Sequence, residues 1–199
     1  AKAMVRALKK LKFGEPVTHV YNPLEYAWKS HQQYLERYGN EKVDYVLLGM
    51  NPGPFGMVQT GVPFGEIEAV RDWMGIQKPV RRPKLEHPKR PIEGFDCSRR
   101  EISGARLWGW AKERFRTPAR FFRRFAVLNY CPLAFLEQSG RNRTPDKLPP
   151  AERASLVGCC DKALAKFIRF YEPKMVIGIG VYAHKRADQV LEAEGLNLA

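Results

Sequence analysis

The stretch Gly49–Gly65 combines residue types that suit the binding of a small, uncharged ligand. It follows residues 44–48, a short and mostly apolar run that is typical of a buried strand in a parallel sheet. A loop in that position lies at the carboxyl end of its strand, where ligands bind in open α/β sheets. Its glycines let the backbone approach a ligand, its prolines stiffen it, and Glu66 is the nearest charge. The stretch predicts a preformed pocket for a flat, mostly neutral group, with an ordinary Gly/Pro-rich connection as the alternative.

Three short apolar runs, separated by helical patterns, must position this loop. The runs lie at residues 45–50, 125–130 and 175–180, and the second again ends in a polar residue before a Cys-Pro turn. The alternation of strands and helices predicts an α/β fold, a single doubly wound domain with a central parallel β-sheet flanked by helices. Helices are expected from Asn22-Pro23 to Gly39, over 66–74, from Ser103, from Thr117-Pro118, between Pro149 and Pro173, and over 181–194.

The length of 199 residues is enough for one domain with a sizeable core. We expect residues 1–20 to form a basic tail, in part vector-derived, and residues 21–199 to form the folded domain. No apolar run reaches the length that spans a membrane, and the amino terminus lacks the apolar region of a signal peptide. We expect an intracellular monomer that binds no membrane, nuclear in a eukaryote or cytoplasmic in a bacterium.

The net charge of +13 is concentrated in one quarter of the chain. Residues 78–124 hold 15 Lys and Arg against 5 Asp and Glu, a net charge of +10, and six Phe and Trp residues are interleaved with them. Basic residues beside aromatic ones suit a phosphate backbone and exposed bases, so the segment favours nucleic acid as a partner. The alternative is a solvated basic surface over a few core aromatics.

The cysteines and histidines do not form a recognisable metal or redox motif. Cys97, Cys131, Cys159 and Cys160 include no C-x-x-C pair, so we expect reduced thiols and neither an iron–sulfur cluster nor another metal site. His31 falls on the apolar face of the expected first helix and is predicted to be a core residue, while His87, in a Pro-rich basic segment, is predicted to be solvated.

Four blocks of sequence carry a resemblance to a known family. They are residues 49–65, Leu128-Asn129-Tyr130-Cys131-Pro132-Leu133, Ser139-Gly140-Arg141-Asn142 and His87-Pro88-Lys89-Arg90-Pro91. These blocks resemble motifs of the single-strand-selective monofunctional uracil-DNA glycosylases, within the uracil-DNA glycosylase superfamily, and the resemblance runs over residues 21–195. The family also has a His-Pro-Ser-Pro-like loop with a catalytic histidine after its last strand. Because no such block precedes Ala199, we expect this domain to lack that strand and loop.

The resemblance implies a glycosylase that hydrolyses an N-glycosidic bond without a metal or cofactor. It implies that Asn51 is catalytic and positions the attacking water, which an amide can orient but cannot deprotonate as a carboxylate can. Met50 and Gly53 would contact the base or ordered water through their backbone N–H groups. Phe64 would stack on the flipped base, and Asn129 would pair with N3–H and O4 of uracil, an edge that cytosine presents in reverse.

The same resemblance implies a substrate range and a DNA-binding surface. A glycine at position 53 leaves room at C5 of the base, so uracil and 5-substituted uracils such as 5-hydroxymethyluracil are the expected substrates, in single- or double-stranded DNA. The absence of a motif lysine suited to Schiff-base chemistry argues against an associated strand cleavage. The residues expected to bind DNA are Arg81, Arg82, Lys89, Arg90, Arg123 and Arg124.

Two other functions stay open at the level of sequence. A nucleic-acid-binding relative with weak or no catalysis would explain why the histidine block is not found. A nucleotide-phosphate enzyme is disfavoured, because the Gly-rich loop lacks the Lys-Ser/Thr ending of a P-loop and the glycine spacing of dinucleotide-binding folds. The hypothesis that the sequence favours is a base-excision repair glycosylase that leaves an abasic site.

Overall fold

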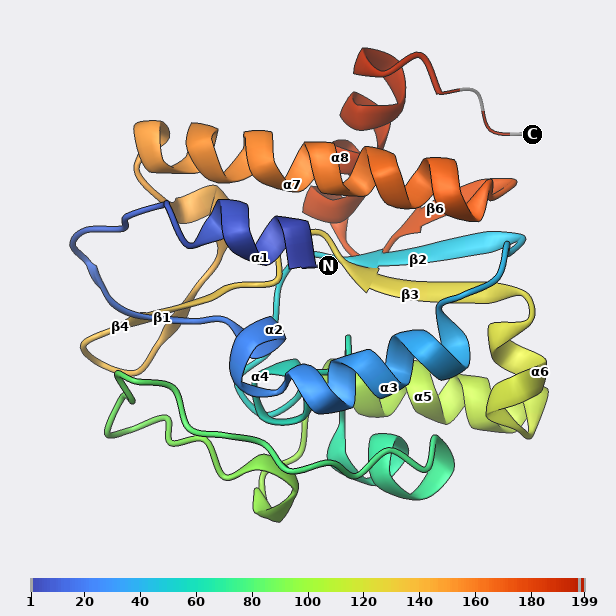
Figure 1. Ribbon diagram of the computed structural model, residues 1–199, viewed down its shortest axis with the longest axis horizontal. Coiled ribbons are helices and arrows are strands. Elements are labelled where there is room, and N and C mark those ends of the chain that lie inside the picture. The colour runs from blue at the N-terminus through green and yellow to red at the C-terminus, as the bar shows by residue number, and fades with distance from the viewer. Residues whose placement is uncertain (1, 197, 199) are drawn as a thin grey trace.

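A three-stranded parallel sheet runs through the centre of the molecule (Figure 1). The computed structural model describes residues 2–196 and 198, in which β2 (Tyr45–Gly49), β3 (Phe125–Asn129) and β6 (Met175–Gly178) pair in the order β3-β2-β6. The register of β2 and β3 sets Gly49 opposite Asn129. The last residues of β2 and β3 therefore lie side by side at the carboxyl ends of the parallel strands.

Helices cover both faces of this sheet, as the doubly wound prediction requires (Figure 1). On one face lie the long helix α7 (Pro150–Tyr171), α8 (Val181–Ala193) and the amino-terminal α1 (Lys2–Leu8). On the other lie α3 (Trp28–Tyr38), α5 (Ile102–Phe115) and α6 (Pro118–Phe122). The remaining helical elements are short: α2 (Pro23–Tyr26), α4 (Met57–Thr60), the π-helix η1 (Ala69–Trp73) and the 3-10 helices η2 (Gly94–Asp96) and η3 (Pro145–Lys147).

The alternation of side chains along β2 divides the apolar core between the two faces. Val46 and Leu48 join the cluster beneath α1, α7 and α8. Leu47 points the other way, into a cluster with Tyr34, Trp108 and the aromatic residues of α6. Successive side chains of a strand point to opposite faces, so a central strand that is buried on both sides must be apolar throughout. This explains why the sequence shows an unbroken apolar run here.

A second, antiparallel sheet corrects the expectation of a basic tail over residues 1–20. It consists of β1 (Val17–Tyr21), β4 (Ala134–Glu137) and β5 (Asn142–Arg143) in the order β1-β4-β5. Before it, Leu8 of α1 is 3% exposed and belongs to the same core cluster as α7. The lysines and arginines of this segment suggested a solvated tail, although the segment forms an amphipathic helix. Its charged face is solvated, whereas its apolar face is buried.

Several helix boundaries agree with those predicted from the sequence, and the segments 66–74 and 49–65 differ from the prediction. Asn22 caps α2 by accepting a hydrogen bond from the backbone N–H of Leu24 at 3.2 Å, and Thr117 caps α6. The helix expected over residues 66–74 is largely a π-helical turn, and the loop 49–65 contains α4. Glu101, not Ser103, is the N-cap of α5.

The two histidines that the sequence distinguished are both buried. His31 is 7% exposed and bonds the carbonyl of Gly61 through Nδ1, and burial lowers its pKa to about 4, which confirms its prediction as a core residue. The prediction that His87 is solvated is wrong, since it is 1% exposed. Its Nδ1 accepts a hydrogen bond from the backbone of Lys89, and its Nε2 lies 3.1 Å from the carbonyl of Glu137. These bonds dock the Pro-rich segment onto the antiparallel sheet.

None of the helices in residues 2–196 is long and apolar enough to cross a membrane. The four cysteines are free thiols, and Cys97, Cys131 and Cys160 are buried.

Gly178, the last residue of β6, is expected to tolerate no side chain. A Cβ there would overlap the backbone of His184 and lie 2.7 Å from its Cβ. Overpacking of this kind costs about 1–3 kcal/mol, so Gly178→Ala should lower the free energy of unfolding by that amount in chemical denaturation. Gly158→Ala in α7 is the control, because a Cβ there meets nothing within 4 Å and alanine favours a helix. Equal effects of the two changes would contradict the close approach of α8 to the sheet.

Candidate active site

The loop after β2 closes over the carboxyl edge of the parallel sheet and encloses a cavity of about 240 Å³. All five residues that the sequence predicted for catalysis and base binding line it, together with four others. The lining consists of Met50, Asn51, Gly53, Met57, Phe64, Glu101, Ser103, Asn129 and Ile179. They come from the ends of all three parallel strands, the loop 49–65 and the start of α5.

Hydrogen bonds that continue the β2–β3 pairing hold the first part of the loop. The backbone N–H of Tyr130 donates to the carbonyl of Gly49 at 2.8 Å, and that of Cys131 donates to Met50 at 2.9 Å. On the other side of β2, the N–H of Ile179 donates to Leu48 at 2.8 Å. The strand ends are therefore fixed to one another beyond the regular sheet, and the side chains that follow them are held over the cavity.

Gly49 is needed because the phenyl ring of Phe64 lies across the end of its strand. A Cβ on Gly49 would lie 2.5 Å from Cζ of Phe64 and 2.6 Å from Oδ1 of Asn129. The ring and the carboxamide therefore converge on the same point. This arrangement offers an aromatic face and a hydrogen-bonding edge to one flat ligand.

The backbone of Phe64 is held in a left-handed conformation, with φ of 53°. Such a conformation costs a non-glycine residue about 1–3 kcal/mol and persists only where the surroundings impose it. Here the carbonyl of Phe64 accepts hydrogen bonds from Nε1 of Trp108 at 2.8 Å and from the backbone N–H of Glu66 at 2.7 Å. Helix α5, which carries Trp108, thus fixes the ring above the cavity.

The carboxamides of Asn51 and Asn129 are held differently. Nδ2 of Asn51 donates to the carbonyl of Leu133 at 3.3 Å, which directs its oxygen as an acceptor. Nδ2 of Asn129 lies 3.1 Å from Sδ of Met57. A thioether is a weak acceptor, so a ligand with a carbonyl oxygen can take that hydrogen bond at little cost. The side chain of Asn51 is therefore held in place, whereas that of Asn129 can replace its contact with Met57 by a hydrogen bond to a ligand.

Glu101 is one of the four residues of the cavity lining that the sequence did not single out for the site. Its Oε1 accepts a hydrogen bond from the backbone N–H of Ser103 at 3.4 Å, so it caps α5 from within the site. Burial raises the pKa of its carboxyl group, and hydrogen bonds from the backbone of Ser103 and Phe55 oppose that rise. The signal in the sequence was an acidic residue two positions before Ser103, and it was read only as part of a basic segment. Its approach to Gly53 arises from the fold.

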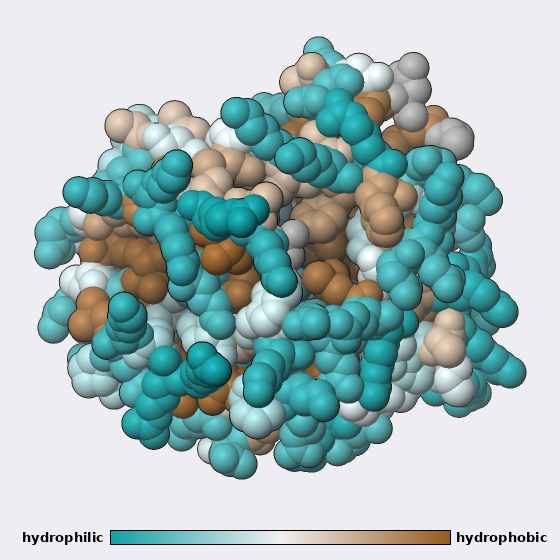
Figure 2. All heavy atoms as spheres, viewed as in Figure 1, coloured by the Kyte–Doolittle hydropathy of each residue, from teal (hydrophilic) through white to brown (hydrophobic). Residues whose placement is uncertain are grey.

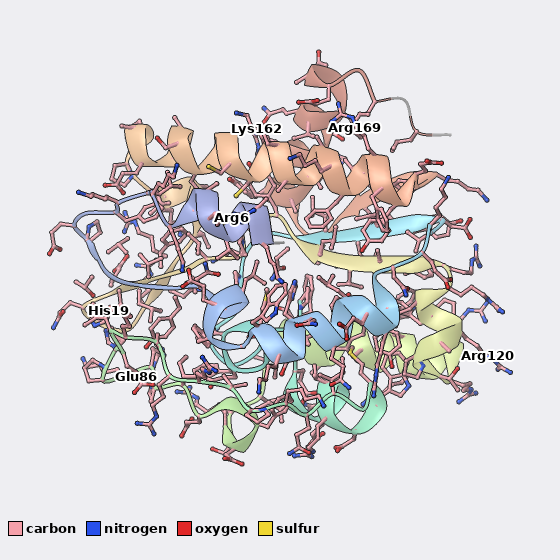
Figure 3. All side chains as sticks on the ribbon, viewed as in Figure 1. Arg6, His19, Glu86, Arg120, Lys162 and Arg169 are labelled. Carbon is pink, nitrogen blue, oxygen red and sulfur yellow. The ribbon has the colours of Figure 1, made fainter. Side chains whose placement is uncertain are left out.

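The six residues predicted to bind DNA do not form one surface. The segment 81–90 lies by the antiparallel sheet, whereas Arg123 and Arg124 directly precede β3. Figure 3 labels Glu86 of the first group and Arg120 of the neighbouring α6 at opposite ends of the molecule. Arg123 and Arg124 are thus at the amino ends of the strands, about 16 Å from the cavity at the rise of a strand.

Arg124 also has a structural partner. Its Nε lies 3.0 Å from Oδ2 of Asp44, just before β2, and Lys174 bonds the same carboxylate. These hydrogen bonds, from Lys174 and then Arg124, lower the pKa of Asp44. Basic residues that are close along the chain in residues 78–124 are thus far apart in the fold, and which of them bind DNA stays a prediction.

Arg90 reaches the loop that forms the cavity, and so does Arg99, which the sequence argument did not single out. Their guanidinium carbons lie 5.6 and 4.1 Å from the ring centre of Phe55, a residue of the loop. Nδ2 of Asn142 donates to the carbonyl of Pro52 at 3.1 Å and ties the same loop to β5.

Hydrophilic side chains cover most of the face in Figure 2, with apolar patches between them.

Known proteins match this chain in both sequence and fold. The sequence model described as the Uracil DNA glycosylase superfamily matches residues 36–196. The single-strand selective monofunctional uracil DNA glycosylases of Bos taurus and Mus musculus are 50% and 48% identical over 184 residues, 92% of this chain. The chain spans 68% and 66% of the length of those two proteins.

A solved structure, that of wild-type SMUG2 from Pedobacter heparinus, matches 100% of this chain and 97% of its own with a TM-score of 0.53. At 17% sequence identity this match shows a shared fold. The resemblance carried by the four sequence blocks is confirmed, and the chain belongs to the uracil DNA glycosylase superfamily, with the single-strand selective monofunctional uracil DNA glycosylases among its relatives.

Proposed function

We propose that the protein is a monofunctional DNA glycosylase that draws uracil out of DNA and hydrolyses the bond between the base and its sugar. The observation that carries this proposal is the convergence of Asn51, Phe64 and Asn129 on one cavity at the carboxyl edge of the sheet. The product is DNA with an abasic site, an intermediate of base-excision repair. The protein acts as a monomer inside the cell, in the nucleus of a eukaryote or the cytoplasm of a bacterium.

The cavity supports recognition of a flat base with a donor and an acceptor on one edge. A base lying against Phe64 presents its edge to Asn129, which is adjacent to the ring at the end of β3. The carboxamide can then accept from N3–H and donate to O4, giving up its contact with Met57. Cytosine would place like groups opposite one another and leave a buried polar group unpaired.

Hydrolysis requires that water add to C1′ as the C1′–N1 bond breaks. The sugar becomes cationic and the base takes the electron pair, much as in glycoside hydrolysis. The water then gives its hydroxyl group to C1′ and its proton to solvent or to the departing base. Asn51, held by its bond to Leu133, orients the water through its carboxamide oxygen. Because an amide does not take the proton, the reaction depends on dissociation that precedes attack.

Extraction of the base costs a few kcal/mol of stacking and pairing, and less in single strands or at mismatches. Arg90 and Arg99, which lie against Phe55 of the loop, and Lys89 next to Arg90 in the chain would hold the phosphates beside the extracted nucleotide. We propose that both single- and double-stranded DNA bind, and that substrates include uracils with a substituent at C5.

A second candidate is a nucleic-acid-binding protein that does not catalyse the reaction. It is favoured by one observation: none of the four histidines is among the residues that line the cavity, so a histidine to stabilise charge on the departing base is not found there. Release of uracil from an oligonucleotide, assayed beside binding to the same oligonucleotide, separates the two functions. Binding without release would favour the second.

Removal of the Asn51 carboxamide should abolish most activity and spare DNA binding. Misplacing a reacting group costs on the order of 100-fold, so Asn51→Ala should slow single-turnover uracil release by about that factor. Its affinity for an oligonucleotide with an abasic site should be unchanged. Asn40→Ala, an exposed asparagine that bonds its own helix, is the control. A rate within about threefold of the parent, less than 1 kcal/mol in barrier, would contradict the role of Asn51.

The two ends of the basic segment should contribute differently to DNA binding. Changing Lys89 and Arg90 together to alanine should reduce the slope of log affinity against log salt by about 0.7 per lost phosphate contact on single-stranded DNA. The same change at Arg123 and Arg124 removes equal charge at the far edge of the sheet and should leave the slope unaltered. Titrations of an abasic oligonucleotide at several salt concentrations measure both. A larger effect of the second pair would place the footprint at the amino ends of the strands.

A further inference from the structure

A groove between α1 and α2 is lined by both cationic and aromatic side chains (Figure 1). It has a volume of about 570 Å³, and the start of α3 and residues 79–81 complete its walls. The backbone N–H of Arg81 donates to the carbonyl of Tyr26 at 3.0 Å, which fixes the last of these walls to α2. Figure 3 labels Arg6, the cation that α1 contributes from its middle. The charged residues of the lining are Lys2, Arg6, Lys9, Lys29 and Arg81, which are basic, and Glu25.

This groove is separate from the cavity at the carboxyl edge of the sheet. The side chain of Tyr26, which lines the groove, donates its hydroxyl proton to the carbonyl of Val58 at 2.7 Å. Val58 belongs to α4, and its neighbour Met57 lines the cavity. Among the described residues, the two hollows have no lining residue in common. Because α4 lies between them, a ligand in the groove leaves the cavity open.

The charges of the groove are not balanced within it. Five basic residues and one acidic residue, counted among those that the structure describes, give it a net charge of +4. The one carboxylate, that of Glu25, pairs with Lys9, whose Nζ lies 3.2 Å from its Oε2. Like charges gathered in one groove repel each other, and a ligand with several negative charges lowers that repulsion and releases its own counterions. The groove therefore suits a polyanion.

Trp28 supplies the groove with an aromatic face. Its ring is half-buried, and Nζ of Lys2 lies 5.5 Å from the ring centroid. An exposed lysine holds such a position weakly, whereas the stacking of a nucleic-acid base on an aromatic ring is a stronger contact. A base can thus take the place of the ammonium group on the ring, and the ammonium group can then contact a phosphate.

We propose that this groove is a second binding site for single-stranded DNA, in which Trp28 stacks on a base and the surrounding cations contact the phosphates. An aromatic face beside several cations suits a single strand, whose unpaired bases are open to stacking. A duplex keeps its bases stacked on one another, and an acidic peptide has no base to place on the ring. The site goes beyond the proposed function, because it requires neither uracil nor catalysis.

Binding of a labelled oligothymidylate, which contains no uracil, tests the charges of the groove. Arg6→Gln together with Lys29→Gln should reduce the slope of log affinity against log salt by about 1.4, since each lost phosphate contact on a single strand removes about 0.7. Lys162→Gln together with Lys166→Gln is the matched control: it removes equal charge from exposed positions of α7 and should leave the slope unchanged. A duplex of the same length should bind equally to the parent and to both variants.

Changes at Trp28 test the stacking. Trp28→Ala should weaken binding of oligothymidylate about tenfold at every salt concentration and leave the salt slope unchanged, because it removes a stacked base and no charge. Trp28→Phe keeps an aromatic face and should restore most of the affinity. Single-turnover uracil release at saturating protein should be the same in the parent, in the Arg6 and Lys29 double variant and in Trp28→Phe.

The outcomes separate failure of the inference from failure of the proposed function. A salt slope that is the same in the Arg6 and Lys29 double variant as in the parent would overturn the inference, whether or not uracil is released. Equal binding of oligothymidylate by Trp28→Ala and the parent, or equal binding of polyglutamate and oligothymidylate, would assign the groove to an acidic ligand without bases and overturn it as well. No release of uracil by the parent would overturn the proposed function alone. If Trp28→Ala does not fold, the double variant of exposed residues decides.

Discussion

The pairing of β2 with β3 is the constraint on which the rest of the site depends. Its register places Gly49 beside Asn129, and two more backbone hydrogen bonds, to Gly49 and Met50, extend it into the loop. These bonds pair main-chain carbonyl groups at the start of the loop, so Gly49 and Met50 are held by the same kind of hydrogen bond as the sheet. Asn51 and Asn129 reach one cavity because of this extension. A shift of the register by one residue would move one asparagine to the other face of the sheet.

The sequence predicted the parts of the fold that depend on local patterns. The three parallel strands are continuous apolar runs because both faces of their sheet are covered by helices. The N-cap residues Asn22 and Thr117 indicate where their helices begin. The antiparallel sheet was missed because β5 is two residues long and β1 includes polar residues. Such short strands exist through pairing between residues distant in the chain, which no local pattern encodes.

The site shows the same division between local and distant effects. Asn51, Gly53, Phe64 and Asn129, which line the cavity, could be predicted as site residues because their motifs follow strands that the sequence pattern indicates. Glu101 could not be found in this way, since its nearness to Gly53 depends on how α5 docks. The ion pair of Arg124 with Asp44 could not be predicted for a related reason, because a count of charges along the chain does not reveal which charges meet. Sequence fixes which groups are available, whereas docking of elements decides which of them meet.

Helix α5 is connected to two parts of the cavity wall, Glu101 and Phe64. Its first turn carries the cap Glu101, and its indole at Trp108 holds the carbonyl of Phe64. A Cβ on Gly104 would overlap that same carbonyl, so the helix lies directly against the backbone of the loop. The contacts of this helix therefore keep the distance between Glu101 and Phe64 constant. A displacement of α5 relative to the sheet would move Glu101 and Phe64 together relative to Asn51 and Asn129, and would so change the alignment of a bound base.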